Sequence, residues 1–179
     1  MSIEQISQEV YVEKAPIVKV AQKDIEYLKE KAILSERKRV RLCTHKDVEE
    51  PLHEMLIVLR KETYVRPHKH LHKSESFHII EGLVDVVIFD DEGKIIEVIQ
   101  MGDYASERRF YYRLSSPYYH IPFIISDYVV IHETTNGPFN RADTLFAPWT
   151  PEENDGEATN QFINQLAEKI KKFNLNSLC

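Results

Sequence analysis

The stretch Arg66-Pro-His-Lys-His-Leu-His-Lys-Ser-Glu-Ser-Phe-His-Ile-Ile-Glu-Gly82 gathers four histidines and a carboxylate in a short segment that favours β-strands. Side chains alternate between the two faces of a strand, so the strand that runs into this segment from residue 64 should present four of them on one face. These are Tyr64, Arg66, His68 and His70. After a turn over residues 71–74, the next strand should carry Glu75, Phe77 and Ile79 on one face and His78 on the other.

This arrangement of side chains is typical of a metal site. Two imidazoles at i and i+2, with a carboxylate from a neighbouring strand, can converge on one divalent cation. Neutral imidazole and ionised carboxylate suit zinc, iron, manganese, nickel or copper. The stretch supplies three ligands, so we expect a fourth from elsewhere in the chain.

The composition indicates an ordinary soluble protein, because 42% of the 179 residues are hydrophobic and 29% are charged. The formal net charge of −6 argues against nucleic acid or an anionic membrane as the main partner. We see no secretory signal and no apolar run of the ~18 residues that a spanning helix needs. A cytoplasmic location is therefore expected, with Cys43 and Cys179 as free thiols.

The hydrophobic pattern divides the chain into three parts that we expect to form one domain. Residues 1–37 should form an arm with possible edge strands at 10–12 and 17–20, followed by a helix over 22–37. Residues 38–153 contain several short strands separated by turns, which favours an antiparallel sandwich or barrel. The clearest hairpin spans residues 83–101, and further strands are expected at 110–114, 118–126 and 128–134. An irregular segment follows residue 138, and residues 154–179 should contain a helix over 159–173.

The spacing His68-x-His70-x4-Glu75-x6-Gly82 resembles the first motif of the cupins, which are small jelly-roll β-barrels with a metal inside. The second cupin motif supplies one more histidine from a later strand. His120 matches it, in Ser115-Ser-Pro-Tyr-Tyr-His120, with Tyr118 on the same face.

Within the cupins, the sequence resembles the WbuC family of cupin-fold metalloproteins over roughly residues 38–153. The matching segments are Tyr64-Val-Arg-Pro-His-Lys-His70, Phe89-Asp-Asp-Glu-Gly93, Gly137-Pro-Phe139 and Phe146-Ala-Pro-Trp-Thr-Pro-Glu152. The resemblance implies a cupin jelly-roll β-barrel with a helix at each end. It also implies one divalent transition metal (Fe, Zn, Mn or Ni), with His68, His70, Glu75 and His120 as ligands.

Other polar and aromatic side chains have two interpretations each. Arg66 could bind a substrate carboxylate, phosphate or sugar hydroxyl, or it could pair with an internal carboxylate such as Glu133. Tyr118 could exchange a proton with substrate, and both Tyr64 and Tyr118 could line the cavity or pack in the barrel. His45 could support the site or lie on the surface. His72 and His78 could be exposed or could pack against other residues. Trp149 could cover the mouth of the barrel as a lid or anchor its loop.

Three functions are compatible with these features. The first is a metalloenzyme that isomerises or oxidises a small polar molecule, such as a sugar or nucleotide-sugar, since the WbuC name is associated with surface-polysaccharide clusters. The second is a non-catalytic cupin that binds or senses a small molecule such as a sugar, with the metal as anchor. The third is a purely structural metal. We also expect a homodimer formed through exposed strand edges.

Overall fold

The computed structural model describes residues 3–176 and shows a mainly β fold with two helices. In chain order the elements are β1 (Glu4–Gln5), β2 (Val10–Val12), α1 (Gln22–Leu34), β3 (Arg39–Cys43), β4 (Leu52–Arg60), β5 (His68–His70), β6 (Glu75–Phe89), β7 (Ile95–Gly102), a 3-10 turn (Tyr104–Ser106), β8 (Tyr111–Leu114), β9 (Tyr119–Asn136), a second 3-10 turn (Arg141–Asp143), β10 (Thr144–Phe146) and α2 (Gly156–Asn176). The predicted β fold with a helix towards each end is confirmed.

The long strand β9 organises the sheet. It pairs with β4, β5 and β6 along its 18 residues. Strands β3, β2 and β1 extend the sheet beyond β4, and β10 extends it beyond β5. Strand β6 also pairs with β8 along its first part and with β7 along its second part. Among these strand pairs only β2 and β3 run parallel, so the antiparallel prediction holds for the body of the fold.

Alternation along the strands builds an apolar interior, because every second side chain of β6 and β9 points inward. The interior cluster consists of Leu59, Phe77, Ile79, Val84, Val86, Ile88, Met101, Tyr112, Ile124, Val129 and Ile131. Glu75 is buried on the same face as Phe77 and Ile79, whereas His78 is exposed. The predicted orientation of this strand is therefore confirmed.

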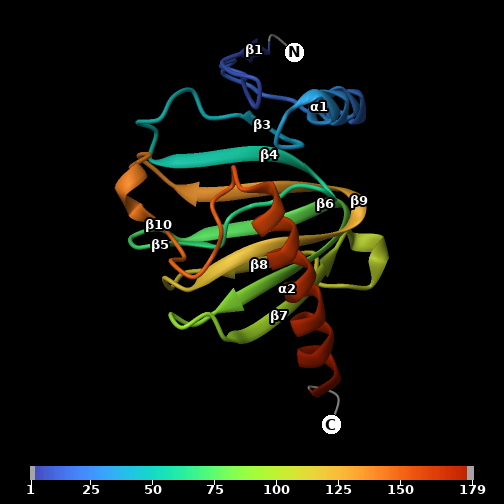
Figure 1. Cartoon of the computed structure of the whole chain (residues 1–179). Coiled ribbons are helices and arrows are strands. Elements are labelled where there is room, and N and C mark those ends of the chain that lie inside the picture. Colours follow the sequence, from blue (N-terminus) through green and yellow to red (C-terminus); the bar gives the residue numbers. More distant parts are fainter. Residues whose placement is uncertain (1–2, 177–179) are drawn as a thin grey trace.

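Helix α1 covers the outer face of β3 and β4 (Figure 1). Its buried stripe of Ile25, Leu28 and Ala32 is the one predicted from the 3.6-residue period. The helix begins where the Asp24 carboxylate accepts a hydrogen bond from the Ala21 N–H at 2.8 Å, which satisfies a donor that the helix leaves unpaired. It ends at Leu34, three residues before the predicted end.

Helix α2 lies across the outer face of β6, β7 and β9 (Figure 1). Leu166 and Ile170 are buried there against Val87 and Ile121. The helix begins earlier than predicted because the Asp155 carboxylate caps it, accepting the Ala158 N–H at 3.0 Å. Neither helix in the described part of the chain has the length and apolar content to cross a bilayer.

Two glycines shape β6. Gly93 has φ +82° in the β6–β7 turn, where Asp90 Oδ1 accepts the N–H groups of Glu92 and Lys94, and this confirms the predicted hairpin. Gly82 has φ +87° and lies against the Tyr128 carbonyl, where any Cβ would collide. The register of β6 against β9 shifts on both sides of Gly82, so this residue marks the bend between the two halves of β6.

Three details differ from the prediction. Residues 17–20 form no strand, and the two strands expected at 118–126 and 128–134 are the single strand β9. Strand β10 lies in the segment expected to be irregular, where it pairs with β5. Cys43 is buried and free, as predicted, whereas Cys179 lies outside the described residues.

Candidate metal centre

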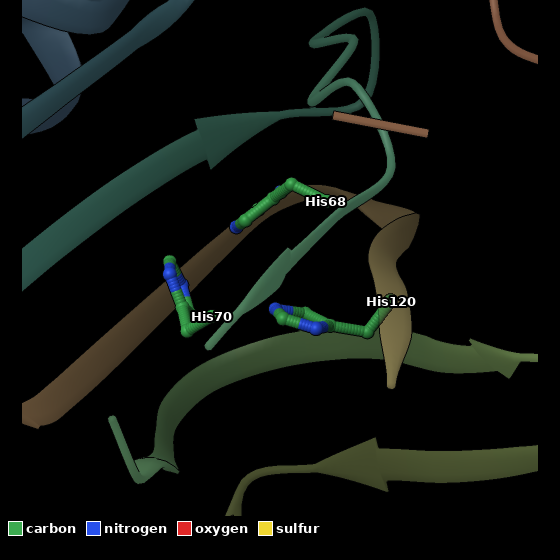
Figure 2. A group of neighbouring side chains, drawn as sticks. All are labelled: His68, His70 and His120. Carbon is green, nitrogen blue, oxygen red and sulfur yellow. The ribbon is translucent and has the colours of Figure 1, made fainter. Parts of the chain in front are cut away.

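Three histidines meet inside the sheet, although they come from two strands that are distant in sequence. His68 and His70 lie on β5, and His120 lies near the start of β9, directly opposite His68 in the register. Figure 2 shows the three imidazoles turning their nitrogens toward one another. One ring nitrogen from each residue lies within 4.8 Å of the other two, which makes the cluster able to hold a metal ion.

Glu75 approaches this cluster from the first residue of β6. Its Oε1 lies 2.9 Å from His120 Nε2, and its Oε2 lies 3.3 Å from His70 Nε2. The Tyr112 hydroxyl donates a hydrogen bond to Oε1 at 2.9 Å. Glu75 is only 4% exposed, so it is not the solvated strand end that a carboxylate at this position could have been.

Each histidine uses its Nδ1 for a hydrogen bond that points away from the cluster. Nδ1 of His68 is 2.9 Å from the Arg66 carbonyl, and Nδ1 of His120 is 3.1 Å from the Tyr118 carbonyl. A carbonyl only accepts, so these two rings carry their proton on Nδ1 and, when neutral, leave the Nε2 lone pair toward the cluster. Nδ1 of His70 instead meets a side chain, the Thr144 hydroxyl, at 3.1 Å.

The surroundings of the cluster favour a neutral His68 and an ionised Glu75, whereas the Glu75 carboxylate makes His120 easier to protonate. Burial, assisted by neighbouring His120, lowers the pKa of His68 to about 3, so its ring is neutral. Burial opposes the ionisation of Glu75, but attraction to His120 and hydrogen bonding outweigh burial and hold the pKa of Glu75 well below its usual value. Burial likewise opposes a charged His120, yet the Glu75 carboxylate raises the pKa of that histidine.

The interatomic distances fit a shared cation. His120 Nε2 is fully buried, has no hydrogen-bond partner within residues 3–176, and lies 2.9 Å from a Glu75 oxygen. Neighbouring ligands held about 2.1 Å from one ion are about 3.0–3.4 Å apart in octahedral and tetrahedral geometry. The 2.9 and 3.3 Å separations agree with that spacing. The donor set of imidazoles and a carboxylate therefore fits a first-row transition ion.

A second interior carboxylate, Glu133, lies next to this group. It is on the same face of β9 as Ile131 and stands opposite Phe77 of β6, two residues along the strand from the Glu75–Thr135 pair. Burial, with the charge of Glu75 adding to it, raises the pKa of Glu133 to about 7. Arg41, His120 and Lys73 act in the opposite sense.

Arg66 and Tyr64 do not face the histidines, which corrects the predicted alternation. Residues 64–67 are not in a strand, because Pro67 interrupts the extended run before β5. The Arg66 guanidinium pairs with Glu152 at 2.7 Å and donates to the Thr150 hydroxyl at 3.2 Å. The alternative pairing of Arg66 with Glu133 is wrong. The Tyr64 hydroxyl donates to the Pro151 carbonyl at 3.1 Å, and its ring packs against Phe162 of α2.

The other candidates also lie outside the cluster. Tyr118 precedes β9, and its side chain is 45% exposed, so its contribution to the cluster comes from its carbonyl. His45 stacks on His53 with ring centroids 4.1 Å apart. His72 and His78 are exposed. Trp149 anchors its loop, because it packs on Phe89 and donates to the Asp91 carbonyl at 3.3 Å.

Sequence patterns missed two side chains that contact the cluster. Tyr112 lies in the predicted strand 110–114. Alternation along that strand places its ring inward, but only if the strand is known to pair with β6, where Tyr112 stands opposite Phe77. Thr144 gave no signal, because it lies 74 residues from His70 in a segment without periodicity. Only the pairing of β10 with β5 reveals its role.

Comparisons with known proteins describe the fold. Residues 20–101 match the model of a domain of unknown function, DUF6016, and no curated protein sequence matches the chain. Salicylate 1,2-dioxygenase from Pseudoaminobacter salicylatoxidans, solved with gentisate, superposes with a TM-score of 0.52 and 14% identity, over 72% of this chain and 37% of its own. The Staphylococcus aureus capsular polysaccharide assembling protein CapF, solved with the inhibitor 3-isopropenyl-tropolone, gives 0.50 and 16%, over 63% of this chain and 32% of its own.

The fold is the cupin jelly roll. A third match, oxalate decarboxylase from Bacillus subtilis, has a TM-score of 0.46 and 16% identity, over 60% of this chain and 27% of its own. The matched part of this chain corresponds to about a third of the length of the dioxygenase and of CapF. Identities at this level establish the common fold, and they leave activity to be argued from the residues of the site.

Proposed function

We propose that this cupin binds one divalent transition metal through His68, His70, Glu75 and His120. The main support is that the Nδ1 atom of each of the three histidines makes a hydrogen bond directed away from the cluster. The Nε2 atom of each ring is thereby turned toward the space beside the Glu75 carboxylate. A histidine that binds a metal through one ring nitrogen usually makes a hydrogen bond to the protein with the other. Iron, zinc, manganese and nickel all accept this donor set.

We infer that the protein is a metalloenzyme for a small polar molecule such as a sugar or nucleotide-sugar, acting by isomerisation or oxidation. A bound metal would supply Lewis-acid polarisation of a ligand oxygen. The residues around it exclude bulk water, since Glu75 and His120 are 4% and 1% exposed. Tyr112 keeps Glu75 oriented by donating to Oε1, and Glu133 adds an interior carboxyl group that can hold a proton.

A non-catalytic small-molecule binder is the second candidate, and one observation favours it. Arg66 is engaged by Glu152 and Thr150, and Tyr118 is exposed. Neither of the two side chains predicted from the sequence to act on a substrate therefore contacts the histidine cluster with its functional group. Membership of the WbuC family, a carbohydrate ligand, the homodimer, the cytoplasmic location and the boundaries at residues 37 and 153 stay predictions.

Metal analysis tests the proposed site. Protein purified without added metal, then loaded and dialysed, should retain about one first-row ion per chain by elemental analysis. Glu75→Ala and His120→Ala should each lose it. His78→Ala is the matched control because His78 is exposed on the opposite face of β6, and it should bind as the wild type does. Equal metal content in wild type and His120→Ala would refute the site.

Turnover separates the two candidate functions once metal is bound. Metal-replete protein is incubated with a panel of sugars and nucleotide-sugars, and products are followed by mass spectrometry and NMR. Conversion that disappears in Glu75→Ala supports the enzyme. Saturable binding of a panel member without conversion supports the binder.

A further inference from the structure

Thr144 lies outside the ligand set, and its side chain contacts the proposed ligand His70. It lies on β10 directly opposite His70 in the β5–β10 register, and its hydroxyl is 3.1 Å from His70 Nδ1. We propose that Thr144 is the positioning residue of His70 and that its hydroxyl lets this one histidine adopt either tautomer. The inference rests on the metal site proposed above.

The outer hydrogen-bond partner of His70 is a hydroxyl, whereas those of His68 and His120 are carbonyls. The carbonyls of Arg66 and Tyr118 accept only, so they keep the protons of His68 and His120 on Nδ1. A threonine hydroxyl both donates and accepts, and it rotates to suit its partner. His70 is thus the only histidine of the cluster whose tautomer is not dictated by its outer hydrogen bond.

Each tautomer of His70 has a place in the structure. Without an ion, the proton can sit on Nε2, which lies 3.3 Å from Glu75 Oε2, and the Thr144 hydroxyl then donates to the bare Nδ1. With an ion, Nε2 must present its lone pair, so the same single proton sits on Nδ1 and the Thr144 oxygen accepts it. The change moves one proton between the two ring nitrogens through solvent, and no net proton is gained or lost.

The backbone allows the hydroxyl to be tested alone. The Leu71 N–H donates to the Asp143 carbonyl at 2.9 Å, and the Ala147 N–H donates to the Pro67 carbonyl at 2.8 Å. These two bonds hold β5 against β10 from either side of Thr144, whatever its side chain. Thr144→Val keeps the β-branched shape of the residue and removes only the hydrogen-bonding group.

The experiment measures zinc and cobalt affinity by chelator competition in four proteins. Thr144→Val should bind each ion about 10- to 100-fold more weakly than wild type. Thr144→Ser should return to within about threefold, because it restores the hydroxyl. Thr134→Val is the control, since the Thr134 hydroxyl makes no hydrogen bond within the described residues of β9 and their neighbours, and it should match wild type. If Thr144→Val unfolds, Thr144→Ala tests the same loss.

A spectroscopic readout distinguishes positioning from general damage. In zinc-loaded wild type and Thr144→Ser, nitrogen-15 NMR should show a slowly exchanging Nδ1–H for His70, as for His68 and His120. In Thr144→Val, only the His70 proton should exchange faster. Wild-type affinity in Thr144→Val would overturn the inference while leaving the metal site intact. A wild-type protein that binds neither ion would instead overturn the site, and the inference with it.

Discussion

Replacing Glu133 by glutamine should make the metal-free protein more stable at neutral and alkaline pH. The carboxyl lies on the inner face of β9, opposite Phe77, and burial with the nearby Glu75 charge raises its pKa from 4.5 to about 7. The folded state therefore holds this proton more tightly than the unfolded state does. Stability from this group is fully present below pH 4.5, and it is lost as the pH rises from 4.5 through 7.

The size of the effect follows from the shift. Each pKa unit corresponds to 1.36 kcal/mol, so the rise from 4.5 to about 7 sets an upper value of about 3 kcal/mol. Partial solvent contact reduces it, since Glu133 is half-buried rather than fully enclosed. Other groups that face Glu133 are Glu75, Arg41, His120 and Lys73, and they are unchanged in the variant.

Urea unfolding of wild type and Glu133→Gln at half-unit steps from pH 4 to 8.5, with chelator present, measures the effect. The stability of the variant relative to wild type should increase by about 2–3 kcal/mol between pH 4.5 and 7 and then level off. Glu97→Gln is the control, because Glu97 is exposed on β7, and its difference from wild type should stay flat. A Glu133→Gln difference that is equally flat across this range would refute the reasoning.

Two further predictions concern the scaffold around the site. Arg66→Ala removes the contacts to Glu152 and Thr150, so it should lower the free energy of unfolding, measured by urea titration, by about 1 kcal/mol and leave metal content unchanged. Glu152→Gln should reproduce most of this loss. A specific loss of ligand affinity in Arg66→Ala would instead restore the substrate-binding role of Arg66. Gly82→Ala should cost about 2–4 kcal/mol and lower the melting temperature, because φ is +87° and the new Cβ meets the Tyr128 carbonyl. Gly156→Ala, where no atom lies within 4 Å of a new Cβ, should be nearly neutral, and equal effects at both positions would contradict this explanation.

The parts of the fold that the sequence predicted are those with a strong local signal. The alternation Glu75–Phe77–Ile79, the Asp90–Gly93 turn and the apolar stripe of α1 each follow from spacing alone, and the structure confirms all three. Helix ends were less accurate. Helix α2 begins at Gly156, three residues before the predicted start at residue 159, because Asp155 caps it.

The parts that failed depend on contacts between distant segments. The orientation of Arg66 was extrapolated from a two-residue period, but Pro67 ends that period and Glu152 provides a partner 86 positions later. Thr144 lacks any local pattern, and its contact with His70 exists only because β10 pairs with β5. The four proposed ligands could be predicted together because their residue types and motif spacing carry information that a single threonine or arginine does not.

The late position of β10 in the chain has a consequence for the order of assembly during synthesis. The segment with His68 and His70 emerges from the ribosome long before residues 144–146, which are its main partner strand. Until that partner arrives, β5 has only one register pair, with His120 of β9, to fix it. A nascent chain that ends before Thr144 therefore contains the three histidines but lacks β10, the strand that holds His68 and His70 in position. Metal should therefore bind only after most of the polypeptide has been made.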